Sequence, residues 1–277
     1  MRRPPREGGL GRILLHVLAA VVVVFLLLPT ILVAPMSVSP DKYLQFPPQG
    51  FSLRWYGEYF ADREWVAATL FSAEAGLISA IGATIIGTMT ALALVRGKVR
   101  GRAFIELLIV GPVVVPHIAL AVAMFLVYEQ LRLTGTLLGF AMAHIVLALP
   151  FAIFTVLAAL YRFDADLEMA ALSCGAGRIR TFWYVTLPMI LPGVASAALF
   201  AFIISFDEAV VSFFISDLDR KTLPRKMFED IDFDVSPVLA AVATMLSLLT
   251  IAILVLGHFL KKLADRRTVP VEQGAKT

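Results

Sequence analysis

The sequence predicts an all-α integral membrane protein, a polytopic bundle of six transmembrane helices with both termini in the cytoplasm. Of its 277 residues 59% are hydrophobic and only 16% are charged, which departs from the composition of a soluble domain. The apolar residues gather in runs of roughly 20 residues or more, long enough to cross about 30 Å of hydrocarbon as helices. The sequence lacks the alternating segments of a membrane β-barrel, so we expect helices to span the membrane.

Six apolar runs define the expected spans, at about 13–35, 70–95, 103–128, 136–160, 188–215 and 238–259. The first run follows a basic patch, as in a cleavable signal peptide, but it is long and lacks a clear small-x-small cleavage site. We therefore expect an uncleaved first span. The spans form one transmembrane domain, residues 13–260, between cytoplasmic tails at 1–12 and 261–277.

The distribution of Lys and Arg predicts the orientation, because positive residues in short flanking segments stay on the cytoplasmic side. The segments 1–12, 96–102, 161–187 and 261–277 hold 16 of the 24 Lys and Arg residues. Both termini and segment 161–187 are therefore predicted to be cytoplasmic. The net charge of +3 follows from this asymmetry, and we expect contact with membrane lipid but no nucleic-acid binding.

The first outward loop and the second span show two packing patterns. In the loop, residues 36–69, an aromatic run from Trp55 to Trp65 is expected to form an interfacial helix with its rings at headgroup depth. The span has a small residue at every fourth position, namely Ala75, Ser79, Ala83, Gly87 and Ala91. Such a ladder lets another helix approach closely where lipid supplies no hydrophobic drive, so it predicts a packing face.

The third span carries two proline sites, Gly111-Pro112 and Pro116-His117, which should break or kink it because proline lacks a backbone donor. Broken helices at membrane depth are tolerated where they line a cavity or pack inside protein. Pro116 and His117 are thus candidates for lining a solute pathway, and a simple kink filled by a neighbouring helix is about equally expected. His144 is a further candidate, although a lone helical histidine more often makes interhelical hydrogen bonds.

Acidic residues at four positions, Glu74, Glu106, Asp207 and Glu208, fall within or at the edges of the spans. A charge at the bilayer centre costs at least ~2.5–3.5 kcal/mol, so these side chains should face the bundle interior, water or the interface. Glu106 lies near the cytoplasmic entry of its span and can simply snorkel. For Ser205, Asp207 and Glu208, in the outer half of the fifth span, we favour a cavity wall or a cation-attracting role slightly over packing.

The polar segment 161–187 reads YRFDADLEMAALSCGAGRIRTFWYVTL and lies between the fourth and fifth spans. It is too charged for lipid, yet it has the apolar-polar pattern of short amphipathic helices, which predicts a docking surface. Its Cys174 is the single cysteine, which excludes an internal disulfide. The sequence has no nucleotide-binding, metalloprotease or nucleophile-elbow motif and suggests no catalytic residue. We therefore expect an external ATPase to supply the work.

This polar segment resembles the EAA loop of the permease subunits of ATP-binding-cassette (ABC) importers, in which Glu-Ala-Ala precedes a Gly and an Ile-x-Leu-Pro at fixed spacing. The chain has Met169-Ala170-Ala171, Gly175 and Val185-Thr186-Leu187-Pro188 at that spacing. Met169 departs from the pattern because it occupies the usual Glu position, although Glu168 precedes it, and Val185 replaces Ile.

The resemblance implies two short helices bent at Gly175 and docked in a groove of an ATPase subunit. Glu168 would take over the electrostatic role of the missing Glu. The other implied positions are the close contacts and apolar anchors of that docking, namely Ala170, Ala171, Gly175, Leu172, Ile179 and Phe182, followed by the Leu187-Pro188 end of the motif.

The resemblance extends over nearly the whole chain. The strings FPPQGFSLRWYGEYF, AHIVLALPF and SFDEAVVSFFIS are similar to those of spermidine/putrescine-type permeases of the bacterial inner membrane. This implies a type I ABC importer permease fold, a second permease chain, two ATPase subunits that bind ATP and Mg, and a periplasmic binding protein. The chain itself would hold no cofactor or metal and would not be an enzyme. Asp207 and Glu208 would suit a cationic polyamine.

Three functions compete on the sequence. An importer permease, for a polyamine or for another small solute such as an amino acid, a metal or an anion, predicts an ATPase bound at residues 161–187. A secondary transporter would show inverted repeats with paired broken helices, and the sequence has no convincing second half. A membrane enzyme would need convergent catalytic groups, whereas Glu106, His117 and His144 are scattered. We rank these functions in that order.

Overall fold

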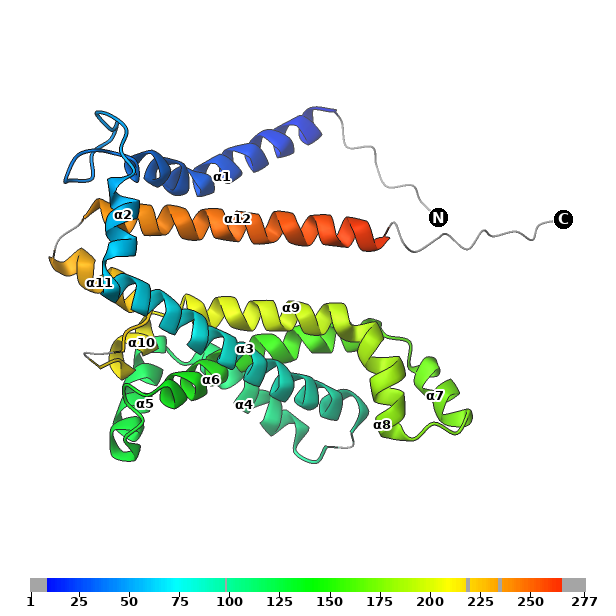
Figure 1. Ribbon diagram of the computed structural model, residues 1–277. Helices are drawn as coiled ribbons and strands as arrows, with labels where there is room; N and C mark the ends of the chain where they lie inside the picture. The colour runs from blue at the N-terminus through cyan, green and yellow to red at the C-terminus, as the bar shows by residue number, and fades with distance from the viewer. Residues whose placement is uncertain (1–8, 98, 218–219, 234–235, 266–277) are drawn as a thin grey trace. The chain divides into compact units, whose positions relative to one another are not determined.

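The computed structural model describes residues 9–97, 99–217, 220–233 and 236–265, and every regular element in these ranges is a helix (Figure 1). The predicted all-α class is therefore confirmed for the described part of the chain. The chain divides into two compact units. One contains the described residues up to Asp62 and from Asp230 on, and the other runs from Arg63 to Glu229.

The first unit contains three helices, α1 (Gly9–Met36), α2 (Arg54–Ala61) and α12 (Pro237–Asp265), and both α1 and α2 contact α12. Polar side chains join α2 to the chain that follows α1. The indole Nε1 of Trp55 donates a 2.7 Å hydrogen bond to the carbonyl of Ser39, and the hydroxyls of Ser37 and Tyr56 are 2.7 Å apart. These bonds fix the direction in which α2 leaves the first span.

Several rings of the aromatic run are buried in the protein. Trp55, Tyr59 and Trp65 are 4%, 6% and 3% exposed, so their rings pack inside the protein. The expected interfacial helix is also interrupted, because α2 ends at Ala61 and the next helix begins at Arg63. Amphipathic rings can satisfy their polar atoms within a protein as well as at a lipid interface, and the depth of this run in the membrane stays a prediction.

The second unit contains the helices that carry most of the predicted site residues. They are α3 (Arg63–Arg96), α4 (Arg102–Val114), α5 (His117–Leu131), α6 (Leu137–Arg162), α7 (Ala165–Ser173), α8 (Arg178–Thr181), the π-helical turn η1 (Phe182–Thr186), α9 (Leu187–Phe206) and α10 (Val210–Ile215). The short helix α11 (Leu223–Phe233) begins in this unit and ends beyond its boundary.

Helices α3, α6 and α9 pack against one another and form the core of the second unit (Figure 1). Seven of the ten buried residues in the main apolar cluster are alanines, so these backbones approach closely. The predicted small-residue ladder on α3 is buried throughout, which confirms it as a packing face. At Gly87 a β-carbon would lie 3.0 Å from the Cβ of Ala152 on α6.

The third predicted span is a broken pair, α4 and α5, bent by 103°. The break falls at Val115 and Pro116, where Val115 is extended (φ −69°, ψ 132°) because the residue before a proline is disfavoured in the α conformation. Pro112, in contrast, lies inside α4, so the helix is not broken there. The proline ring clashes with the β-carbon of the residue before it, and Gly111, which precedes Pro112, has no β-carbon.

The fifth predicted span differs most from the structure. A continuous helix runs from Arg178 to Phe206, so it begins within the polar segment rather than at Pro188. The π turn η1 precedes Pro188, and its wider hydrogen-bond spacing accommodates a proline that cannot donate to the previous turn. The helix ends at Asp207, and α10 is a separate helix, so the span does not continue unbroken to Ile215.

Four of the described helices are long and apolar enough to cross a membrane, or five if the bent pair counts as one span. Over the residues searched, the last predicted span is a shorter apolar helix, Pro237–Ala252. Six spans and cytoplasmic termini therefore stay predictions. The ends of both predicted tails, residues 1–8 and 266–277, lie outside the described residues.

We expect Gly87→Leu to destabilise the protein, because the new side chain would separate α3 from α6. Overpacking of this kind typically costs about 1–3 kcal/mol and should lower the midpoint of thermal unfolding in detergent. Gly11→Leu is the matched control, because a β-carbon at Gly11 in α1 would meet nothing within 4 Å. Equal unfolding midpoints for the two variants would contradict close packing at Gly87.

Candidate functional site

The polar segment 161–187 folds around a sharp bend at Gly175. Asp164 caps α7, since its carboxylate accepts a 3.0 Å hydrogen bond from the amide of Asp166. At the other end Gly175 has φ +87°, and the amides of Gly175 and Ala176 donate to the carbonyls of Leu172 and Ala171. These two bonds form a Schellman motif, which ends α7 and turns the chain towards α8.

The outward surface of the two short helices carries exposed apolar side chains beside charged ones. Met169 and Ile179 are 62% and 78% exposed, Leu172 is 38% exposed, and Gly175 is open to solvent. Ala170 is exposed as well and Ala171 is half-buried, so small residues lie beside these larger side chains. The arrangement can accept a complementary protein surface without moving a bulky side chain.

The remaining predicted positions of the segment are less exposed. Phe182 is half-buried and packs edge to face on Trp183, with ring centroids 5.5 Å apart. Leu187 is half-buried, whereas Pro188 is exposed on the following turn. These side chains belong to the junction between the polar segment and the long helix.

Two aromatic residues that were not predicted as part of the site, Trp183 and Tyr184, are 59% and 78% exposed. They line an open hollow of about 890 Å³ together with Ile179 and Arg180. A helix that begins at Arg178 predicts this surface, because residues four apart lie on the same face. Ile179 and Trp183 form one such pair, and Arg180 and Tyr184 form the other.

Glu168 faces the bundle rather than the outward surface. Its Oε2 lies 3.0 Å from Nε of Arg96 at the end of α3, and its Oε1 accepts a 2.9 Å hydrogen bond from the hydroxyl of Thr186 in η1. The neighbouring Met169 lies on the exposed side of α7. The two residues that the sequence offered for the usual acidic position are thus on different sides of the helix.

A second candidate region is a cavity of about 320 Å³ where two helix breaks meet. His117 lies on it from the start of α5, next to Pro116, which precedes that helix. Asp207 and Glu208 lie on it from the end of α9. The structure therefore brings together three of the predicted pathway residues. Asp207 is exposed, whereas Glu208 is buried and accepts a 2.7 Å hydrogen bond from the amide of Val211.

His144 and Ser205, also predicted as pathway candidates, lie buried in a polar network instead. The Nδ1 of His144 is 2.7 Å from the hydroxyl of Ser205, and its Nε2 is 3.2 Å from the hydroxyl of Ser212. His144 is 0% exposed and joins α6 to α9 and α10. This is the interhelical hydrogen bonding that the sequence left open as the alternative to a pathway role.

The other two acidic residues of the spans lie apart from this cavity. Glu106 forms a 2.8 Å ion pair with Arg102 one turn earlier on α4, at the edge of the span where it was expected to snorkel. Glu74 is exposed on α3. Neither residue lines the cavity that holds Asp207.

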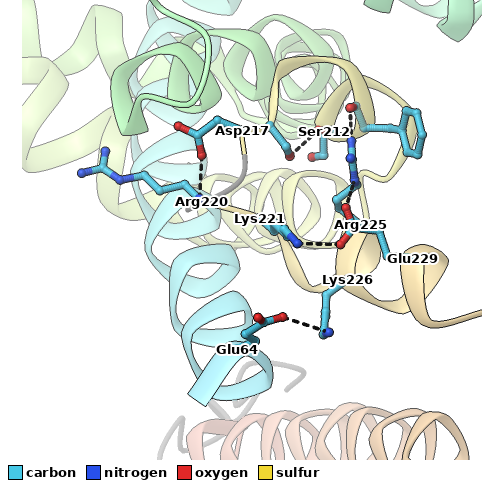
Figure 2. A network of polar contacts seen from close by, with 10 residues as sticks. Glu64, Ser212, Asp217, Arg220, Lys221, Arg225, Lys226 and Glu229 are labelled. Carbon is cyan, nitrogen blue, oxygen red and sulfur yellow. Dashed lines mark hydrogen bonds and ion pairs between the residues drawn. The ribbon is translucent and has the colours of Figure 1, made fainter. Parts of the chain in front are cut away.

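A network of charged side chains holds the start of α11 on the second unit (Figure 2). Glu229 accepts 2.8 Å hydrogen bonds from Lys221 and Arg225, and Arg225 also donates to the carbonyl of Phe213 in α10. Lys226 pairs with Glu64 in the first turn of α3 at 3.1 Å. The network thus links the loop after α10 to the beginning of α3.

The carboxyl of Glu229 is shifted by two opposing effects. Burial alone would raise its pKa, but hydrogen bonds from Lys221 and Arg225 and their positive charges outweigh that effect, so the pKa is lowered. The carboxylate form is thus the one that the folded network favours.

The comparisons with known proteins agree with one another. The family described as binding-protein-dependent transport system inner membrane component matches residues 83–267. The chain is 31% identical over 245 residues to the spermidine/putrescine transport system permease protein PotC of Haemophilus influenzae, with 87% of this chain and 94% of that protein covered. It is 30% identical over 229 residues to the putrescine transport system permease protein PotI of Escherichia coli, with 80% and 81% covered.

A solved structure shows the same fold. A chain of a bacterial ABC transporter involved in the import of the acidic polysaccharide alginate superposes with a TM-score of 0.68, over 95% of this chain and 99% of that one. The sequences are 16% identical, so this likeness concerns the arrangement of helices alone.

We expect Glu229→Gln to reduce the pH dependence of stability. The pKa of the Glu229 carboxyl is lowered in the folded protein. Its contribution to the free energy of unfolding is therefore complete above the ordinary glutamate pKa of about 4.3, and it is lost as the pH falls through the pKa of the folded state. Thermal unfolding in detergent between about pH 7 and pH 3 should show a stability difference between wild type and variant that shrinks with acidification. Glu106→Gln, from an exposed pair within one helix, should show a smaller difference. A difference for Glu229→Gln that is constant with pH would contradict the assignment.

Proposed function

The chain belongs to the family of binding-protein-dependent transport system inner membrane components, and we propose that it is the permease subunit of an ABC importer for a polyamine. Membership places it in the inner membrane. The solute is inferred from relatives, since PotC and PotI are permeases of spermidine/putrescine and putrescine transport systems. The apolar helices of the structure agree with a membrane-embedded subunit.

The observation that best supports this proposal is the bent pair α7 and α8. Two short helices meet at Gly175, and their outward surface carries exposed apolar side chains at Met169, Leu172 and Ile179. A surface of this kind on an otherwise lipid-compatible chain suits docking of a soluble partner. In our proposal the partner is an ATPase subunit, which binds ATP and Mg and hydrolyses ATP, while this chain carries no catalytic residue.

The complete importer would contain two ATPase subunits, this chain, a second permease chain and a periplasmic binding protein. We propose six spans with both termini in the cytoplasm, which places the polar segment on the ATPase side and α11 on the periplasmic side. The transmembrane domain would cover residues 13–260. Closure of the ATPases would move α7 and α8 and tilt the spans, which gives alternating access by rigid-body motion.

The cavity between the two helix breaks supports a cationic solute. Asp207 is exposed on it and Glu208 lines it, so the local charge attracts a polyamine cation rather than an anion. Irregular backbone at membrane depth is tolerated where it lines such a cavity. His117 completes the polar part of the lining, and we propose these three residues as transient contacts along the pathway.

Purification in mild detergent tests the docking of the ATPase. We expect the wild-type chain to co-purify with an ATPase and a second permease, and Gly175→Glu to lose most of the ATPase. A non-glycine residue in the left-handed conformation is strained by about 1–2 kcal/mol, which with an added anion should lower ATPase recovery at least about fivefold. Mass spectrometry of the purified material measures this recovery.

Gly177→Glu is the control for charge, because Gly177 lies two residues further on with an ordinary φ of −73° and open space around it. It should retain more ATPase than Gly175→Glu. Absence of any ATPase from the wild-type material, under conditions that keep a known importer intact, would refute the proposed function and favour a secondary transporter.

Uptake of putrescine tests the role of Asp207. We expect Asp207→Asn to reduce uptake by up to about tenfold, the low end of the enhancement that a charged cleft gives to capture of an opposite charge. Co-purification of the ATPase should be unaffected. Glu106→Gln, which removes an exposed carboxylate away from the cavity, should transport normally. Equal uptake by the two variants would show that Asp207 does not contact the solute.

A further inference from the structure

The acidic side chain beside the Ala-Ala pair connects three elements of the second unit. We propose that Glu168 is a positioning residue that clasps α7 to the end of α3 and to η1, so that a displacement of α7 moves two spans together. This inference rests on the proposed function, in which α7 docks on an ATPase. It assigns to Glu168 a role within the permease rather than at the ATPase surface.

The contacts of Glu168 use both carboxylate oxygens. Oε2 lies 3.0 Å from Nε of Arg96, and Oε1 lies 3.5 Å from a terminal guanidinium nitrogen of the same residue. Oε1 also accepts the 2.9 Å hydrogen bond from the hydroxyl of Thr186. A two-pronged contact of this kind fixes the direction as well as the distance between the partners.

The register of α7 determines which side chain can make these contacts. Successive residues of a helix are rotated by about 100°, so Glu168 and Met169 cannot share one face. The side chain of Glu168 is 19% exposed, whereas Met169 is 62% exposed. An acid one position earlier than in the usual motif is therefore directed at α3, and the outward position carries an apolar side chain.

The surroundings favour the ion pair. Arg96 lies in the last turn of α3 and Glu168 in the first turn of α7, so each charge is at the helix end that stabilises it. The guanidinium of Arg96 also lies 5.8 Å from the ring centroid of Phe163, which directly precedes the capping residue of α7. The side chains are 32% and 19% exposed, so solvent screens this pair less than the half-exposed pairs elsewhere on the chain.

The clasp gives α7 a mechanical connection that the chain itself does not provide. This helix has nine residues and is joined to α6 by two residues and to α8 through the bend at Gly175. Without side-chain links a force on α7 would be taken up in these bends. With Glu168 bound to Arg96 and Thr186, the same force acts on the end of α3 and on η1, directly before α9.

The test measures transport per ATP hydrolysed by the complete complex in proteoliposomes, with putrescine as the solute. We expect Glu168→Gln to keep the ATPase bound and hydrolysing while the ratio falls at least about fivefold, the low end of typical coupling between sites. Thr186→Val, which removes only the hydroxyl and leaves a side chain of similar shape, should lower the ratio in the same direction. This second variant keeps the test valid if Glu168→Gln assembles poorly.

The charge-reversed pair Arg96→Glu with Glu168→Arg separates the ion pair from general damage. Arg96→Glu alone should lower the amount of putrescine transported per ATP hydrolysed, and the reversed pair should restore part of that loss. The recovery is partial because both reversed charges oppose their helix dipoles. Glu106→Gln removes a carboxylate from an ion pair that lies within one helix, and its ratio should equal that of wild type.

Three results would overturn the clasp. They are an unchanged ratio in both Glu168→Gln and Thr186→Val, no recovery in the reversed pair, or selective loss of the ATPase from Glu168→Gln, which would place Glu168 at the ATPase. A wild-type complex that shows no ATP-driven uptake would instead refute the proposed function, and the clasp with it.

Discussion

The close contact of α3 with α6 and α9 is the constraint on which the second unit depends. Lipid tails are as apolar as leucine, so association of helices in a membrane relies on packing between surfaces that approach closely. The ladder on α3 supplies such a surface, and Gly87 leaves room for the backbone of α6. Once these helices are fixed, the broken pair α4–α5 and the interruption before α10 have a rigid support. The polar segment is likewise held at the end of α3 through Arg96.

The two interruptions gather most of the polar chemistry inside the spans. Backbone that leaves a helix in a membrane must find other hydrogen-bond partners. Glu208 meets part of this demand by accepting a hydrogen bond from the amide of Val211, and His144 joins α6 to one hydroxyl on each side of the break before α10. These hydrogen bonds hold the irregular chain in place. Asp207 and His117, on the same cavity, are exposed.

Composition and periodicity are sufficient to predict the all-α class, the packing face of α3 and the break at Pro116. These features follow from local rules about apolar length, residue size and proline. The sequence could not place the start of the fifth helix, because a π turn accommodates Pro188, whereas the polarity before it suggested short helices separate from the span. It also could not distinguish His144 from His117, since burial depends on which helices pack around each ring. For the same reason the inward direction of Glu168 required the positions of α3 and η1.

The early start of the fifth helix bears on how a docked partner could act at a distance. The 29 residues from Arg178 to Phe206 form unbroken helix that turns between α8 and α9 (Figure 1), and they connect the outward surface of the polar segment to the cavity at Asp207. A displacement of its first turn would be passed to α9 through hydrogen-bonded backbone, whereas a loop in its place would absorb more of the displacement. The displacement would reach the end of the helix, at Asp207. The exposed charge on the cavity would therefore respond most directly to a movement at α8.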